Sequence, residues 1–244
     1  MCVVALAWNC HPRWRLILAG NRDEFRGRPT SALQRWDDAP HLIAGRDLQS
    51  GGSWLGVSEE GQRLAVVTNL TGFGDPDPDA ASRGALIADF LCGSGEHAAL
   101  PISTFDRFNP FNLIVIEGTS ARFLTNRPEA ASQDLSFGIH ALSNGAPQLS
   151  WPRKDQLHQD LSAWLAAEAD DPLTLFGPLR DVTGAGAEIQ RPVFIDGLAY
   201  GTRCSTVIAV DIGGKGIIAE RRFGPNGIVE GETRIGFDWS ANNS

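Results

Sequence analysis

The chain opens with two apolar runs that a short polar turn separates, and this pattern restricts the fold more than any other feature. Residues 2–8 and 14–20 are almost entirely apolar, and the segment between them contains His11 and Pro12. Such runs are typical of adjacent antiparallel strands in a sheet that is buried on both faces. A hairpin brings the end of its second strand beside the start of its first. We therefore expect residues 20–23 to lie near Cys2.

Hydrophobic patterning predicts further strands on both sides of a helical middle region. Strands are expected over residues 55–58, 64–70, 111–117, 121–125, 204–211 and 217–223. One helix is expected from a cap at Ser82 to about Cys92, and another from Pro152 to Ala169. A third is expected after Pro172. Strands, then helices, then strands favour one α+β domain over residues 1–244, with helices covering antiparallel sheets.

Composition excludes several classes of protein. The 21 Lys and Arg residues against 29 Asp and Glu leave a formal charge of −8, which is the wrong sign for binding nucleic acid or an anionic membrane. Four cysteines without a CxxC pair indicate reduced thiols in the cytoplasm, and their spacing from the histidines offers no metal site. Arg13 and Arg15 interrupt the amino-terminal apolar stretch, so we expect neither a signal peptide nor a membrane span.

Cys2 is the first candidate for chemistry. A small residue after Met1 normally permits removal of that methionine, which would leave Cys2 with a thiol and a free α-amine. An α-amine has a pKa of about 7.7–8.0 and a thiol about 8.5, so the amine can take the thiol proton near neutral pH. This residue would then be a nucleophile that needs no histidine base. Alternatively, Cys2 begins an apolar strand and packs as a small hydrophobic residue.

A polar segment, Asn21-Arg22-Asp23-Glu24, follows the second apolar run. Near Cys2, a carboxylate can hold a protonated α-amine, and a guanidinium can hold a substrate carboxylate or a developing oxyanion. The other interpretation is a solvated turn in which Arg22 and Glu24 form surface ion pairs of little energetic value.

These motifs, taken with others that follow in order, resemble the NRDE family, also called the Transport and Golgi organization 2 family. The resemblance spans about residues 2 to 210. The segments that carry it are Cys2, Asn21 to Phe25, Arg28-Pro29, Gly51 to Gly56, Thr68-Asn69, Arg83 to Leu86, Phe111 to Ile114, Leu142 to Asn144, Trp151 to Lys154 and Tyr200 to Arg203.

The resemblance implies the fold of the N-terminal nucleophile (Ntn) hydrolases, a four-layer αββα sandwich. The segment layout is most similar to the choloylglycine hydrolase and penicillin V acylase branch of that superfamily. The resemblance implies that Cys2 is the nucleophile, that Asp23 contacts its α-amine, that Asn69 and Asn144 serve the oxyanion, and that Arg203 lies near the nucleophile. That branch carries an arginine where this chain has Gly20, and neither Arg22 nor Arg15 is in register with it.

Two functions are therefore expected for the chain. The first is an amidohydrolase or acyltransferase that acts on a small acylated metabolite without a cofactor. Residues expected to bind its substrate are Asn21, Arg22, Trp54 and His140. The alternative is a non-catalytic protein that binds and hands over haem, acyl-CoA or a lipid on the same fold. Non-covalent haem would have Cys2 or a histidine, such as His140, as its donor, because no CxxCH motif is present. Nothing in the sequence points to an oligomeric state.

Overall fold

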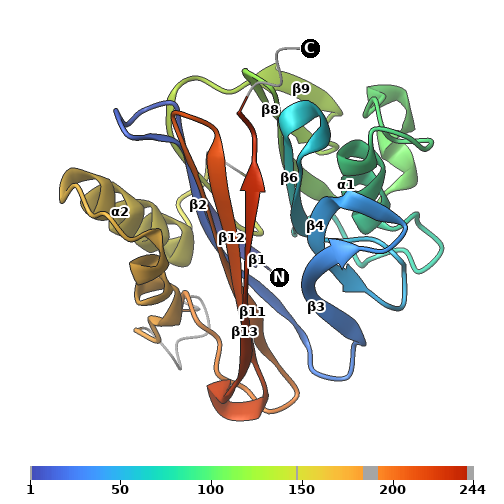
Figure 1. Cartoon of the computed structure of the whole chain (residues 1–244). Helices are drawn as coiled ribbons and strands as arrows, with labels where there is room; N and C mark the ends of the chain where they lie inside the picture. The colour runs from blue at the N-terminus through green and yellow to red at the C-terminus, as the bar shows by residue number, and fades with distance from the viewer. Residues whose placement is uncertain (1, 147, 184–191, 241–244) are drawn as a thin grey trace. The chain divides into compact units, whose positions relative to one another are not determined.

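The computed structural model describes residues 2–146, 148–183 and 192–240, and it divides the chain into two compact units (Figure 1). The first unit comprises Met1–Gly27 and Phe137–Ser244, and the second comprises Arg28–Ser136. Each unit contains one antiparallel sheet and one α-helix among the described residues. The first unit is discontinuous in sequence because the second is inserted into it. A single domain over residues 1–244 stays a prediction.

The sheet of the first unit has six strands in the order β10-β1-β2-β11-β12-β13, all antiparallel to their neighbours. The strands are β1 (Cys2–Trp8), β2 (Trp14–Phe25), β10 (Gly138–Leu142), β11 (Tyr200–Asp211), β12 (Lys215–Phe223) and β13 (Val229–Asp238). The helices are α2 (Pro152–Ala166) and the short 3-10 helices η3 (Pro172–Phe176), η4 (Pro178–Arg180) and η5 (Pro225–Gly227). The predicted hairpin is confirmed, because Cys2 pairs with Arg22 across β1 and β2.

Helix α2 covers one face of this sheet (Figure 1). Successive residues of a strand point to opposite faces, so Val3, Ala5 and Ala7 of β1 share the face that packs on the helix. The helix contributes Leu157 and Leu161 to the same core, and both are completely buried. The apolar side of the helix predicted from Pro152 therefore packs on the sheet. Burial of these side chains from two elements holds the helix on the sheet.

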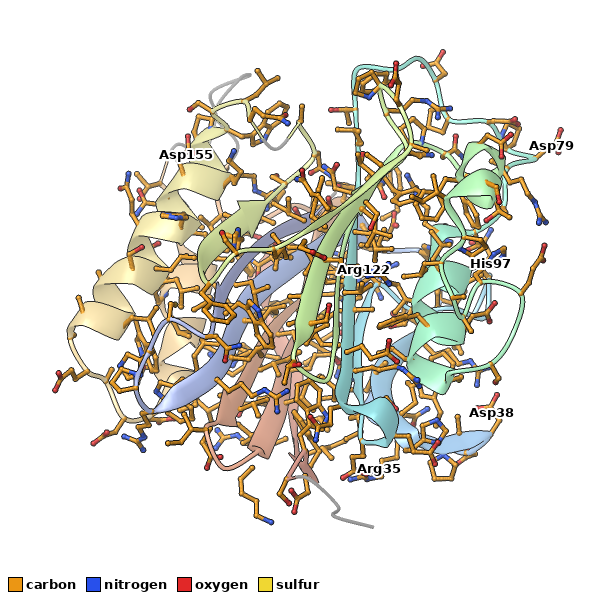
Figure 2. The ribbon with its side chains drawn as sticks, turned by 90° about the horizontal axis from the view of Figure 1, so that it is seen from above. Arg35, Asp38, Asp79, His97, Arg122 and Asp155 are labelled. Carbon is orange, nitrogen blue, oxygen red and sulfur yellow. The ribbon has the colours of Figure 1, made fainter. Side chains whose placement is uncertain are left out.

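Asp155, in the first turn of α2, hydrogen-bonds to the residues that precede the helix. One carboxylate oxygen of Asp155, which Figure 2 labels, accepts hydrogen bonds from Ser150 Oγ at 2.5 Å and from the backbone N of Trp151 at 3.2 Å. Pro152 occupies the first helical turn, as predicted. The helix ends at Ala166, three residues before the predicted end, because Glu168 adopts a left-handed conformation with φ of 50°.

The sheet of the second unit has seven strands in the order β3-β4-β5-β6-β7-β8-β9. The strands are β3 (Thr30–Trp36), β4 (Ala39–Asp47), β5 (Leu55–Ser58), β6 (Arg63–Asn69), β7 (Phe111–Glu117), β8 (Ser120–Thr125) and β9 (Ala131–Asp134). The helices are α1 (Arg83–Cys92) and the 3-10 helices η1 (Glu60–Gln62) and η2 (Ile102–Arg107). The predicted cap of α1 is confirmed, since Ser82 Oγ accepts a hydrogen bond from the N of Gly84 at 3.3 Å. Helix α1 packs on β4, β5 and β6.

The loop before β5 makes a close backbone contact with the start of α1. A Cβ atom on Gly52 would lie 2.3 Å from the carbonyl carbon of Gly84, and Ser53 N donates to the Gly84 carbonyl at 3.3 Å. Only glycine permits this approach. The two glycines belong to separate motifs of the sequence, and their contact explains why both motifs contain one.

Replacing Gly52 by alanine is expected to lower the free energy of unfolding by about 3 kcal/mol, because backbone must move to accommodate the new methyl group. Urea denaturation followed by circular dichroism measures this change. Gly27→Ala is the matched control, since a Cβ there meets nothing within 4 Å. Equal denaturation midpoints for Gly52→Ala and Gly27→Ala would show that the contact does not constrain the loop.

Candidate functional site

Strand β1 begins at Cys2, and buried polar side chains that directly follow β10 hold this end of the strand. The backbone N of Cys2 donates a hydrogen bond to Oδ1 of Asn144 at 3.2 Å, and Ser143 Oγ donates to the Cys2 carbonyl at 3.0 Å. Ser143 and Asn144 directly follow β10, which pairs with β1, and both are buried. An N–H donor requires an acceptor, so the oxygen of the Asn144 amide faces Cys2 and its Nδ2 is the donating end.

The thiol of Cys2 lies in an environment that favours its protonated form. The side chain is buried, and burial raises the pKa of the thiol above its ordinary value. The carboxylate of Asp23 raises this pKa further, whereas the guanidinium groups of Arg22 and Arg153 lower it. Because burial dominates, the thiol is protonated at neutral pH and needs a base before it can attack a carbonyl.

Asp23 is fixed by two hydrogen bonds to its carboxylate. Its Oδ2 accepts from Arg153 Nη1 at 2.7 Å, and its Oδ1 accepts from Thr202 Oγ1 at 2.7 Å. The side chains of Asp23 and Arg153 are 0% and 1% exposed, so this is a fully buried ion pair. The phenol of Tyr200 donates to the Asp23 carbonyl at 3.3 Å. The carboxylate therefore has a defined position, and its charge acts on the Cys2 thiol.

Asn21 lies on the face of β2 that packs on α2 and is completely buried. Its Nδ2 donates to the carbonyls of Leu179 and Val193 at 2.8 and 2.9 Å, and its Oδ1 accepts from Ser205 Oγ at 2.6 Å. These contacts hold the segment that contains η4 and Val193 against the sheet. They favour a structural role for Asn21, and its expected contact with a substrate stays a prediction.

The interpretation of residues 21–24 as a solvated turn after the second strand is wrong. Strand β2 continues through Phe25, because Asp23 pairs with Thr202 and Phe25 pairs with Tyr200 on β11. Period-two alternation then separates the motif between two faces of the sheet, so that Arg22 lies opposite the face that carries Asn21 and Asp23.

Arg22 is flanked by two thiols. It pairs with Cys2 on β1 and with Cys204 on β11, and directly paired residues of antiparallel strands share a face. One of its guanidinium nitrogens lies 3.6 Å from a carboxylate oxygen of Glu24 on the same strand. Its expected contact with a substrate carboxylate stays a prediction.

Three positions concern the arginines of the site. Gly20, where the choloylglycine hydrolase branch carries an arginine, pairs with Val4 and Thr206. Arg203 lies at a bulge of β11, where its Nη1 donates to the carbonyls of Phe25 and Arg26 at 2.9 and 3.0 Å, and its expected place near the nucleophile stays a prediction. The guanidinium bound to Asp23 comes from Arg153 of α2. The sequence motif Trp151 to Lys154 contained this residue, but no role was assigned to it.

His140 pairs with Leu6 of β1, four residues along the strand from Cys2. This separation corresponds to roughly 13 Å at the spacing of a β-strand. His140 is therefore not adjacent to the thiol, and its expected role as a haem donor or substrate contact stays a prediction. Within the described ranges, no group of three or more His, Cys, Asp or Glu side chains is placed to hold a metal ion.

Asn69 and Trp54 belong to the second unit. Asn69 is the last residue of β6 and pairs with Phe111 of β7, and the carbonyl of Trp54 accepts a hydrogen bond from Val67 N at 2.9 Å. Their expected functions at the oxyanion and the substrate stay predictions.

Cys204 provides a pH-dependent contribution to stability. Burial raises the pKa of its thiol well above the ordinary value, and the charge of Glu220 together with a hydrogen bond from the thiol to that carboxylate raises it further. An unfolded chain loses this proton at about pH 8.5, whereas the folded chain retains it. The contribution of the Cys204 thiol to the free energy of unfolding is therefore fully present below about pH 8.5. It is lost as the pH rises through the pKa of the thiol in the folded state.

We expect the free energy of unfolding to decline between pH 8 and pH 10, and to decline less in Cys204→Ala. The difference between the two slopes is at most about 1.4 kcal/mol for each pH unit, the equivalent of one proton. Urea denaturation at closely spaced pH values measures both slopes. Equal slopes in the wild type and in Cys204→Ala would show that the Cys204 thiol makes no pH-dependent contribution to stability.

The fold and the site define a class of protein. It is a sheet-rich protein with two antiparallel sheets, whose first strand begins at a buried cysteine beside a buried asparagine and a buried carboxylate–guanidinium pair. None of its helices, over the residues described, has the length and apolar character needed to cross a membrane.

The family model for Transport and Golgi organisation 2 matches residues 1–225, and the chain belongs to this family. A Transport and Golgi organization protein 2 homolog of Bos taurus is 30% identical over 261 residues, which cover 91% of this chain and 92% of the relative. The homolog of Homo sapiens is 29% identical over 274 residues, covering 96% and 97%. The Drosophila melanogaster protein of this name is 27% identical over 252 residues, covering 86% and 88%. Membership of the family that the motifs resembled is confirmed.

Proposed function

We propose that the chain is an amidohydrolase or acyltransferase for a small acylated metabolite, with Cys2 as its nucleophile once Met1 has been removed. The observation that carries this proposal is the position of the Cys2 backbone nitrogen, 3.2 Å from Oδ1 of the buried Asn144. The same acceptor is available to the α-amine that removal of Met1 would create. The charge of Asp23 acts on the thiol beside that nitrogen.

The proposed reaction begins when the α-amine takes the proton of the Cys2 thiol. The thiolate attacks the substrate carbonyl, the C–N bond of the amide breaks, and the α-ammonium returns its proton to the leaving amine. Water then hydrolyses the thioester, or a second nucleophile accepts the acyl group. Ionised Asp23 would stabilise the α-ammonium, and Asn144 Nδ2 would donate to the oxyanion. The raised pKa of the Cys2 thiol supports the need for a base.

The proposal includes the Ntn-hydrolase fold for the whole chain, the αββα sandwich that the motifs imply. This proposed fold is supported by the architecture of each unit, which is an antiparallel sheet with an α-helix packed on it. Strand β1 also begins at the proposed nucleophile, so the residue that reacts is the first residue of a buried strand.

Mass spectrometry of the protein from a cytosolic host tests the proposal. Intact mass is expected to show loss of Met1. After incubation with a butyryl thioester or an N-acyl anilide and quenching in acid, the peptide that contains Cys2 is expected to carry the acyl group. Cys2→Ala should give no adduct, whereas Cys10→Ala, at an exposed cysteine of the turn after β1, should retain it.

Retention of Met1 in the intact protein would overturn the proposed mechanism, because Cys2 would lack its amine. Absence of an adduct, with haem or acyl-CoA binding equally to wild type and Cys2→Ala, would instead favour the non-catalytic binding function. Haem binding is measured by the absorbance of added haemin, and acyl-CoA binding by calorimetry.

A further inference from the structure

Arg153 occupies an unusual position for a cation. It lies in the first turn of α2, and its side chain is 1% exposed. Nη1 donates to Asp23 at 2.7 Å and Nη2 donates to the Val193 carbonyl at 2.9 Å. The guanidinium therefore links the start of the helix, the end of β2 and the segment that precedes β11.

Three features of this arrangement oppose stability. A cation in the first turn of a helix is repelled by the positive end of the helix dipole. Removal of both charges from water carries a desolvation penalty that their attraction often fails to offset, and well-packed apolar residues in such places are often at least as stable. In addition, Nε of Arg153 is buried and has no hydrogen-bond partner among the described residues. Folding alone therefore gives little reason for an arginine here.

The pair lies on the face of the sheet opposite the side chain of the proposed nucleophile, and both of its charges act on the Cys2 thiol. Asp23 follows Arg22, the residue that pairs with Cys2 across the hairpin. Several titratable and charged groups act on one another around this thiol. They are Arg22, Asp23 and Glu24 of β2, Tyr200 and Cys204 of β11, Glu220 of β12 and Arg153 of α2. Arg153 is the one among them that binds the Asp23 carboxylate in the buried pair.

A buried carboxylate without a cation takes up a proton, because burial disfavours its charged form. A neutral Asp23 would give no electrostatic support to an α-ammonium at Cys2. The hydrogen bond from Arg153 and the bond from Thr202 occupy different oxygens of the carboxylate, so together they also fix its rotation. The charge and the direction of Asp23 therefore both depend on Arg153.

We propose that Arg153 is a positioning residue, which supplies the counter-charge of the Asp23 carboxylate and fixes it in place so that it can support the α-ammonium of Cys2. The inference rests on the proposed function, since it requires the free amine of Cys2. Arg153 does not touch the substrate in this scheme and acts only through Asp23.

Titration of the Cys2 α-amine by NMR, in protein labelled with ¹⁵N-cysteine, tests the proposal. Arg153→Gln is expected to lower the midpoint of the amine titration by about 0.5 pH unit, because loss of the Asp23 charge outweighs loss of the Arg153 charge, which acts less strongly on Cys2. Arg153→Lys keeps the cation and should restore a midpoint near that of wild type. Arg221→Met, which breaks the partly exposed ion pair with Glu232, is the matched control and should leave the midpoint unchanged.

A folded Arg153→Gln with the wild-type midpoint overturns the positioning role. If Arg153→Gln does not fold, the double variant Asp23→Asn, Arg153→Met, which removes both charges and leaves neither unpaired, should shift the midpoint in the same direction, and an unchanged midpoint there overturns the role equally. Intact mass distinguishes this failure from that of the proposed function. A retained Met1 overturns both proposals, whereas loss of Met1 with an unmoved midpoint overturns only the role of Arg153.

Discussion

Asp23→Asn is expected to lower the free energy of unfolding by about 4 kcal/mol, one of the largest effects of any single substitution in this chain. The substitution keeps the shape of the side chain but leaves the guanidinium of Arg153 buried without its counter-charge. Urea denaturation at neutral pH measures the loss. The same physical reason predicts a loss of similar size for Arg153→Met, which leaves the carboxylate unpaired.

The double variant Asp23→Asn, Arg153→Met distinguishes two contributions to the free energy of unfolding. One is the net stabilisation by the ion pair, and the other is the cost of leaving one charge of the pair buried and unpaired. The double variant removes both charges, so its loss should be much smaller than the sum of the two single losses. Arg221→Met is the comparison, because its ion pair with Glu232 is partly exposed and is worth at most about 1 kcal/mol. If Asp23→Asn destabilised the protein no more than Arg221→Met does, the buried pair would not have the energetics assigned to it.

Cys2→Ala is expected to reduce kcat/KM by about 10⁶-fold for any substrate that forms the acyl adduct, the loss typical of removing a catalytic nucleophile. The alanine side chain cannot form the thioester, while the strand around it is retained. Steady-state kinetics on purified protein measure the change. Because the thiol is buried and small, the accompanying loss of stability should be modest, and denaturation of the variant checks that it is folded.

Cys10→Ala is the matched control for this loss. Cys10 is an exposed, free cysteine in the turn between β1 and β2, and its removal should leave kcat/KM unchanged. Turnover that survives in Cys2→Ala at more than a small fraction of the wild-type value would contradict the role of Cys2 as nucleophile.

Much of the fold could be predicted from local patterns. Strands over residues 2–8, 55–58 and 111–117 have the predicted bounds, because their apolar runs end at turn residues that allow no continuation. Prediction failed where polar residues lie within a strand. Residues 21–25 belong to β2 because β11 pairs with them, and no local propensity reports that pairing.

The candidate site was also predictable only in part. The amino-terminal hairpin placed Arg22 beside Cys2, and the motif that ends in Asn144 pointed to the residue bonded to its nitrogen. Arg153 was missed because the residue that it binds is 130 positions away in the sequence. The available signal was a basic residue directly after the proline of a predicted helix, where a cation needs an anion to compensate for the helix dipole.

The sequence by itself therefore determined the strands that are continuous apolar runs, the two α-helices, the family and the nucleophile candidate, because each depends on residues close together or on motifs. Tertiary structure alone decided which polar groups meet. Sheet order brings β10 and β2 to either side of β1, and packing of α2 on that sheet places Arg153 against Asp23. A buried charge is tolerated only where a distant segment supplies its partner, and that partner is chosen by topology rather than by local sequence.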